Sequence, residues 1–343
     1  MTQNISPTST QAWQSIIAKY NKPRLSSSVW QLINSLVPYF LLWVLMAFTL
    51  KISFWLTLPL IILASGFLIR IFIIFHDCGH GSFFKSKKLN FYIGSACGML
   101  AFTPYHKWTD LHRAHHQTVG NLDKRGAGDV WTLTVDEYLN LTPFRRFVYR
   151  FFRHPFTLLG LGGIATFIIG NRFSNRRMTR KQRLNVYATN VIMLAAASLV
   201  SWAIGWQAFL IIQLPVMFLA SIGGIYLFYL QHQYEDVIWC RQDEWDYKKM
   251  ALEGSSFFKL PRILQWFTGN IGFHHIHHLG PTIPNYNLPK AYKENELFRE
   301  IEPISLFESF KALSIRFWDE ANQRVVGLKE LRLRNEMASS TGS

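Results

Sequence analysis

Long stretches without a charged residue constrain this chain more than any other feature. Residues 29–50 are 22 consecutive uncharged positions, and residues 184–231 are 48. As a helix, the shorter stretch is about 33 Å long at ~1.5 Å per residue, which is enough to cross a hydrocarbon layer of ~30 Å. The chain is therefore expected to be an integral membrane protein.

Four spans are expected, because Gly205-Trp-Gln207 divides the longer stretch and a second apolar run follows Lys51. Arg70 is the one charge within the spans, and a charge near the end of a span can reach the lipid headgroups. The predicted spans are residues 29–50, 52–75, 184–204 and 208–230.

The predicted fold class is an all-α integral membrane protein with four transmembrane helices in two hairpins, capped by a cytosolic helical domain. Residues 1–343 are expected to form a single domain. Within it, we expect a cytosolic or interfacial location for residues 76–183 and 231–343, and flexibility for residues 1–25 and 338–343.

The net charge of +15 at pH 7 would suggest a nucleic acid partner for a soluble protein. Here the basic residues instead crowd the segments beside the apolar stretches, and residues 171–183 carry six of them without an acid. This is the positive-inside bias of membrane proteins, so no nucleic acid partner is expected. It predicts a location in the cell (plasma) membrane with both termini in the cytosol. Three scattered cysteines fit that reducing compartment.

Two shorter apolar segments, residues 89–105 and 156–170, are predicted to be interfacial or re-entrant. Between them, Thr142 and Pro143 predict the start of an amphipathic helix on the membrane surface. Near the C-terminus, a capping box from Ser305 to Glu308 predicts an amphipathic helix that reaches Phe317.

The histidines are clustered. The pair in His76-Asp-Cys-Gly-His80 has i, i+4 spacing, and the i, i+3, i+4 spacing occurs in both His112-Arg-Ala-His-His116 and His274-His-Ile-His-His278. Such spacings place imidazoles on one helical face. His232 follows the last span, so all the groups are expected on the cytosolic side. Adjacent imidazoles would repel each other if all were protonated, whereas a shared metal cation keeps them neutral.

Nine or ten imidazoles exceed the four ligands of a single zinc site, and they favour two ions with higher coordination numbers. A pair of irons is the best match. Ligand type alone leaves copper and zinc open, since imidazole also suits these metals.

The three histidine motifs resemble the histidine boxes of the membrane fatty acid desaturases, in spacing, order and relation to four spans. The similarity covers roughly residues 25 to 320. The phrases His76-Asp-Cys-Gly-His-Gly-Ser-Phe-Phe84, Gln231-His-Gln-Tyr-Glu-Asp236 and Thr268-Gly-Asn-Ile-Gly-Phe-His-His275 are similar to the bacterial acyl-lipid branch in particular.

The resemblance implies a membrane-bound acyl-lipid desaturase that introduces a cis double bond into an acyl chain, using O2 and two external electrons at a di-iron centre. It implies no catalytic residue beyond the metal ligands. The implied ligands are His76, His80, His112, His115, His116, His232, His274, His277 and His278.

Three further positions lie close to these ligands in the sequence. The acyl-CoA branch has an Asn that contacts a metal through water, where this chain has Phe228. Asn270 is four residues before His274 and is a candidate for a similar contact. His275 is the weakest ligand candidate, because its neighbours already satisfy the spacing.

Carboxylates near the boxes are candidates for orienting the imidazoles. Solvated loop acids are an equally good interpretation of each. The candidates are Asp77, Asp110, Asp123, Asp129, Glu235 and Asp236.

The chain has no cysteine cluster, no GxGxxG motif and no His-Pro-Gly-Gly haem motif. We therefore expect no flavin, haem or iron-sulfur cluster in the chain and a separate electron donor, which the resemblance implies is ferredoxin or flavodoxin. The basic loops are candidates for docking such an acidic protein, although membrane contact explains them equally well.

Three alternatives remain open at this point. A membrane di-iron hydroxylase or ketolase has the same boxes and differs in its product. A histidine-rich metal or haem transporter predicts ionisable residues near span centres, where this chain has almost none. A membrane zinc hydrolase needs far fewer histidines.

Overall fold

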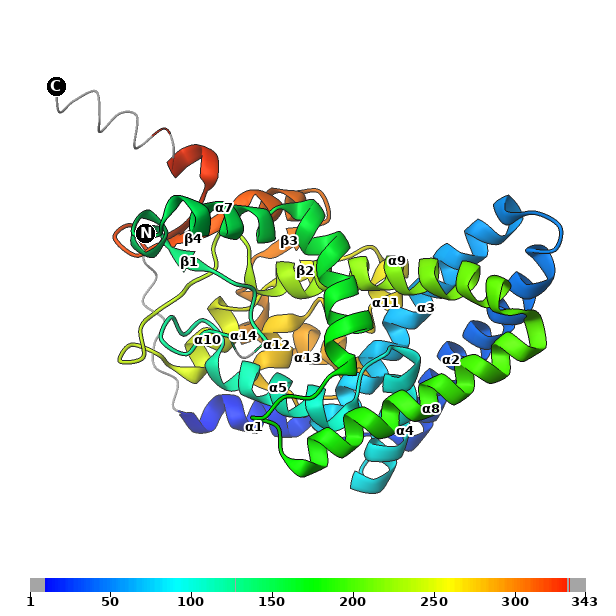
Figure 1. Ribbon diagram of the computed structural model, residues 1–343. Coiled ribbons are helices and arrows are strands. Elements are labelled where there is room, and N and C mark those ends of the chain that lie inside the picture. Colours follow the sequence, from blue (N-terminus) through cyan, green and yellow to red (C-terminus); the bar gives the residue numbers. More distant parts are fainter. Residues whose placement is uncertain (1–9, 127, 332, 334–343) are drawn as a thin grey trace.

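Four long apolar helices form one end of the molecule in the computed structural model, which describes residues 10–126, 128–331 and 333. In Figure 1 they extend to the right, and the other elements gather at the left. Each is long and apolar enough to cross a membrane, which confirms the expected membrane fold with four spans. They are α2 (Leu25–Thr49), α3 (Phe54–His80), α8 (Arg180–Ile204) and α9 (Trp206–His232).

The helices α3 and α9 are longer than a membrane requires. Each has 27 residues, or about 40 Å at ~1.5 Å per residue, so each extends about 10 Å beyond a hydrocarbon layer of ~30 Å. Their C-terminal ends carry His76, His80 and His232. The additional length therefore places these imidazoles outside the apolar layer.

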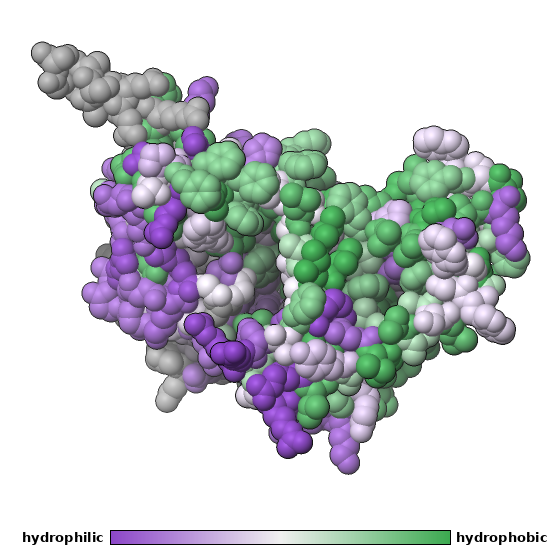
Figure 2. All heavy atoms as spheres, viewed as in Figure 1, coloured by the Kyte–Doolittle hydropathy of each residue, from purple (hydrophilic) through white to green (hydrophobic). Residues whose placement is uncertain are grey.

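The spans differ in how much protein surrounds them. Ile61, Ile71 and Ile74 of α3 are fully buried between α2, α4 and α9. In contrast, α8 exposes large apolar side chains such as Leu194 and Trp202. Figure 2 shows hydrophobic residues over the half of the molecule that holds the long helices, with hydrophilic residues concentrated at the opposite end. The helix α3 is thus the central element, and α8 presents most of its surface to lipid.

Arg70 does not reach toward the headgroups as expected. Its side chain is buried, its Nε donates to Ser35 Oγ at 3.0 Å, and its guanidinium lies 3.9 Å from the ring centroid of Trp266. A further hydrogen bond goes to the carbonyl of Trp266. The expected snorkelling is wrong because α2 and the short helix that carries Trp266 supply these partners inside the protein.

The remaining helices surround the ends of the long ones. They are α1 (Thr10–Tyr20), α4 (Lys87–Leu100), α5 (Tyr105–Thr118), α6 (Val135–Leu139), α7 (Pro143–Phe152), α10 (Tyr247–Glu253), α11 (Arg262–Phe267), α12 (His274–Leu279), α13 (Leu288–Glu294) and α14 (Glu296–Arg299).

The chain is mostly helical, with short strands that the sequence did not predict. A parallel pair joins β2 (Phe257–Lys259) to β3 (Pro303–Ser305). A three-stranded sheet has the order β1-β4-β5, with β1 parallel and β5 antiparallel to the middle strand. Its strands are β1 (Leu133–Thr134), β4 (Ile315–Asp319) and β5 (Arg324–Gly327).

The segment after α7 winds as two π-helical turns, η1 (Thr157–Leu161) and η2 (Ile164–Ile169). Gly163 lies so close to α9 that a Cβ there would be 2.3 Å from Ser221 Oγ. Together α7 and residues 157–172 are apolar enough for a span but bent by 67°, the form of a broken span or a re-entrant loop.

The helix α7 begins after the predicted cap, Thr142, whose side chain accepts from the Arg145 amide.

Flexibility was expected at both ends of the chain. Flexibility of residues 1–25 is wrong for its described part, because α1 packs there: Ile17 and Tyr20 are buried, and the Tyr20 hydroxyl donates to Glu294 at 2.7 Å. The expected flexible residues 338–343 lie outside the described residues.

The predicted helix from Ser305 to Phe317 is wrong in its length. The capping box forms, but the helix is a 3-10 segment, η5 (Glu308–Ser314), and Phe317 lies in β4. Residues 315–319 pair with β1 and β5 as a strand, which buries Phe317 and Trp318 on opposite faces of the sheet.

Candidate metal centre

The first pair of histidines occupies the C-terminal end of α3. The helix ends there because Gly81 adopts the left-handed conformation, with φ of 72°. His76 and His80 are one turn apart, and their ring centroids are 4.7 Å apart. The i, i+4 spacing therefore directs both imidazoles into the interior of the molecule, toward α5 and α12.

The helix α5 carries three more histidines: His112, His115 and His116. Lys107, near the start of this helix, joins it to the segment before α8: its Nζ donates to the carbonyls of Gly170 at 2.6 Å and Phe173 at 3.1 Å. The third motif forms α12, where the Tyr247 hydroxyl donates to the carbonyl of His278 at 2.6 Å. Both helices present their i, i+3, i+4 faces to the ends of α3 and α9.

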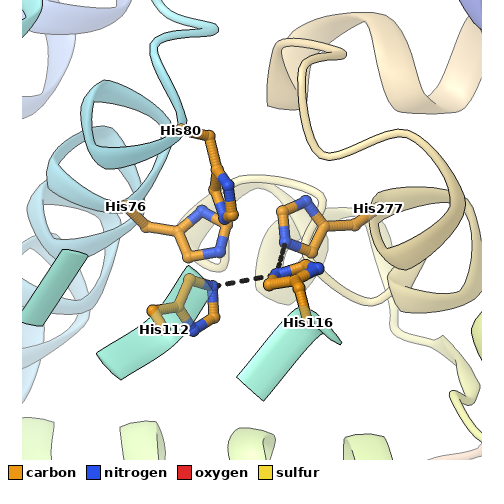
Figure 3. Close-up of side chains that lie close together, drawn as sticks. All are labelled: His76, His80, His112, His116 and His277. Atoms are coloured by element: carbon orange, nitrogen blue, oxygen red, sulfur yellow. Dashed lines mark hydrogen bonds between the residues drawn. The ribbon is translucent and has the colours of Figure 1, made fainter. Parts of the chain in front are cut away.

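Five of the nine predicted ligands form what we call the five-histidine group. The side chains converge from α3, α5 and α12 on one point (Figure 3), and the candidate ligand atoms all lie within 4.8 Å of one another. The Nε2 atom of His116 is 3.1 Å from the Nε2 atoms of both His112 and His277. The members are His76, His80, His112, His116 and His277.

His115, His232 and His278 form a second cluster, the three-histidine group, with ligand atoms again within 4.8 Å of one another. His115 Nε2 is 3.0 Å from His232 Nε2, and His274 Nε2 is 3.1 Å from the same atom. His274 therefore lies beside this group. The two groups are adjacent, since the rings of His116 and His278 stack at 4.0 Å.

The residues present fit metal ions. Two nitrogens bound at right angles, each about 2.1 Å from an ion, are about 3.0 Å apart, close to the separations above. Buried imidazole nitrogens without a hydrogen-bond partner include His80 Nε2 and both ring nitrogens of His278. The two groups are thus able to bind metal, and their donors are all nitrogen.

Five of the imidazoles outside the spans are held in the neutral form that binds a metal. Burial, and then the neighbouring imidazoles, lowers the pKa of His112, His116 and His277 well below the usual value. The same causes lower the pKa of His274 and His278. At neutral pH these side chains have lone pairs available for a metal ion.

Two of the six candidate carboxylates contact imidazoles. Asp129 Oδ1 is 2.7 Å from His115 Nδ1, and Asp77 Oδ1 is 3.1 Å from His76 Nδ1. An Nδ1–H donated to a carboxylate leaves Nε2 free to bind a metal. Of the other four, Asp110 pairs with Arg113, Asp123 pairs with Arg241, and Glu235 and Asp236 are exposed.

Sequence reasoning missed a buried network behind Asp77. Asn285 donates to Asp77 Oδ2 from its backbone at 2.7 Å and from its side chain at 2.8 Å. Gln31, in the first span, donates to Asn285 Oδ1 at 3.1 Å. In the three-histidine group, the carbonyl of Gly254 is 3.1 Å from His232 Nδ1. No spacing signals these contacts, because they join segments distant in the sequence or involve backbone atoms.

The weaker candidates lie outside both groups. His275 Nε2 is 3.2 Å from the Phe298 carbonyl, and burial lowers the pKa of His275 to about 4. Asn270 bonds to Gln265 and to the carbonyl of Asn285. The Phe228 ring is 5.3 Å from His115 and 5.7 Å from His232, so it covers the three-histidine group with an apolar face.

A family model described as fatty acid desaturase matches residues 53–304, which include every histidine of both groups. The chain belongs to the fatty acid desaturase family. A fatty acid desaturase of Bacillus subtilis is 44% identical over 316 residues, covering 92% of this chain and 90% of its own.

More distant desaturases are also similar. An endoplasmic reticulum omega-3 fatty acid desaturase of Vigna radiata is 30% identical, covering 73% of this chain and 67% of its own. An sn-1 acyl-lipid omega-3 desaturase (ferredoxin) of Synechocystis is 28% identical, covering 69% of this chain and 67% of its own. The chain is thus an O2-dependent oxidoreductase, which confirms the predicted family and enzyme class.

Proposed function

We propose that this desaturase introduces a cis double bond into the acyl chains of membrane lipids, at two iron ions held by nine histidines. One ion would be held by the five-histidine group and the other by the three-histidine group together with His274. When bound, the iron pair supplies the chemistry that uses O2 and two electrons to remove hydrogens from an unactivated methylene. The observation that carries the proposal is the adjacency of the two groups.

The protein's own residues orient this centre and protect it from water. Asp77 and Asp129 each accept an Nδ1–H from a histidine and so direct its Nε2 inward. Phe228 covers His115 and His232, and Trp108 stacks on His112 at 4.3 Å. These aromatic faces exclude water from two sides of the site.

The substrate class is supported by the placement of the centre. The histidines follow directly on two spans, α3 and α9, so an acyl chain lying among the spans can reach them while its lipid headgroup stays at the interface. A methylene chain has no hydrogen-bonding groups, so its binding depends on apolar burial. The Synechocystis relative is named as an acyl-lipid enzyme, which supports the same substrate class.

A cytosolic site in the plasma membrane is supported by charge and by contacts. The basic start of α8 lies beside α5, since the Asn185 side chain accepts from the His106 amide at 2.9 Å and Gln182 donates to Asp110 at 2.7 Å. The start of α8 and the ends of α3 and α9 therefore share one side. The positive-inside bias makes that side, and both termini, cytosolic.

The electron donor is proposed to be a soluble acidic protein of the ferredoxin or flavodoxin type. The name of the Synechocystis relative includes ferredoxin. The basic segment around Arg180 and Lys181 is exposed beside the helix that carries His112 and His116. Opposite charges favour fast encounter of such partners.

The test is gas chromatography with mass spectrometry of the total fatty acids from a bacterial host that expresses the chain. The His277→Ala variant is the control, because it removes one proposed ligand. New double bonds with the wild type alone support the proposal and give their position. Hydroxylated or keto products would contradict it and favour a hydroxylase with the same boxes.

A further inference from the structure

A cavity of about 630 Å³ lies away from the nine proposed ligands, and its volume is in the range of small-molecule sites. Its walls come from the second half of α7, from β4 with the preceding Ser314, and from residues 327–330 and 333. None of the nine proposed ligands lines it. The cavity therefore has no part in the site described above.

Cationic side chains dominate the polar part of this cavity. Arg150, Arg316 and Lys329 line it together with His154. The one carboxylate in the described lining, Glu330, is already bonded to Arg324. The described lining thus has three full positive charges, and its one carboxylate is already paired.

A fourth cation lies directly behind this wall. The Arg153 side chain is 1% exposed, and its Nη2 donates to Gln233 at 2.9 Å and to the carbonyl of Ile315 at 3.1 Å. Its Nε and Nη1 are buried without a hydrogen-bond partner. Among the described residues, no carboxylate pairs with any of these four cations. Buried positive charge without an anion is costly, so a bound anion would stabilise this part of the fold.

The surroundings favour an anion that carries an apolar tail. Phe317 and Leu328 contribute an apolar wall. The outer face of α7 exposes Phe144 at 73% and Phe147 at 58%. Figure 2 shows hydrophobic residues in the region of α7 and of the segment that follows it. Since α7 and residues 157–172 are together apolar enough for a membrane segment, the cavity opens beside an element suited to contact lipid.

We propose that this cavity binds the phosphate group of an anionic phospholipid. Arg150, Arg316 and Lys329 contact the phosphate oxygens, for which guanidinium and ammonium groups are suited. The apolar wall contacts the first part of the acyl chains, and the exposed phenylalanines of α7 lie in the adjoining lipid. The site binds a lipid independently of the reaction at the histidines.

The test uses the full chain purified in detergent and measures retained lipid by native mass spectrometry, with phosphatidylglycerol and neutral phosphatidylcholine as probes. The wild type is expected to retain phosphatidylglycerol in preference. Arg150→Gln removes one charged contact and should weaken that binding about tenfold. Lys329→Gln, at an exposed position, should have a similar effect without endangering the fold.

Arg145→Gln is the matched control. It makes the same charge change on the same helix, but Arg145 does not line the cavity. Equal weakening by Arg145→Gln and Arg150→Gln would show attraction by net charge alone and would overturn the proposal. Thermal stabilisation by inorganic phosphate, without retention of phosphatidylglycerol, would also overturn it in favour of a free phosphate site.

Discussion

The two histidine groups are built in different ways. In the five-histidine group, His80 and His112 are only partly buried, whereas every member of the three-histidine group is buried. Each group has one imidazole bonded to a carboxylate, His115 to Asp129 and His76 to Asp77. Each also has buried ring nitrogens without a hydrogen-bond partner, in His278 and in His80. The groups therefore differ in burial: the smaller one is fully enclosed, and the larger one is more open. The two groups thus differ in how closely solvent can approach their ligands.

The largest expected effect is the loss of turnover when either group loses a ligand. His277→Ala opens the five-histidine group and His115→Ala opens the three-histidine group. Each should abolish desaturation, because the reaction needs both ions, and should leave membrane insertion intact, because neither residue lies in a span. Fatty acid analysis and membrane fractionation measure the two properties. Near-normal activity of either variant would contradict the division into two working groups.

A smaller effect is expected when a carboxylate behind one group is changed. Asp129→Asn should lower metal affinity of the three-histidine group, and Asp77→Asn that of the five-histidine group, each by about 10–100-fold. Asp77 also accepts two hydrogen bonds from Asn285, so Asp77→Asn should destabilise the fold as well. Competition with a chelator of known affinity measures each loss. Loss of both metals in the Asp129 variant would argue against separate groups.

His275→Ala should affect the fold and leave the metals in place. The change leaves the buried carbonyl of Phe298 without its partner, at a cost of about 1–3 kcal/mol in the free energy of unfolding. Iron content should stay at the wild-type level, because His275 belongs to neither group. A fall in iron content without a fall in thermal stability would make His275 a ligand after all.

No effect on iron is expected from His106→Ala or His154→Ala, the two histidines other than His232 that lie outside the boxes. The His106 ring stacks on Phe91 at 5.1 Å, and His154 lines the cavity near α7. Metal analysis of the purified variants is the measurement. Loss of iron from either would show that sequence spacing is a poor guide to ligands in this chain.

The part of the site that was predictable is the part set by local helix geometry. The spacings in the three motifs place eight of the proposed ligands on shared helical faces, so these could be named in advance. His232 lies outside the motifs and was named from its place after the last span and from the resemblance. Their division into a five-histidine group and a three-histidine group could not be predicted. His277 joins the five-histidine group and its neighbour His278 the three-histidine group because α12 points between the ends of α3 and α9. That arrangement depends on packing between distant segments.

The same limit explains the errors in the fold. The four spans follow from apolar length alone, which needs no knowledge of neighbours. Arg70 is buried because Ser35 and Trp266 reach it from other helices. Residues 10–20 lack a long apolar run, yet Ile17 and Tyr20 are buried, and the Tyr20 hydroxyl donates to Glu294. Phe317 lies in a strand and not in the predicted helix because β4 pairs with β1 and β5.

The central claim is that these histidines form two metal positions and that both hold iron. The most direct test is the metal content of the full chain, purified from cells grown with iron, by elemental mass spectrometry. Our account predicts two iron ions per chain and no bound zinc. One iron per chain, or zinc in place of iron, would contradict it.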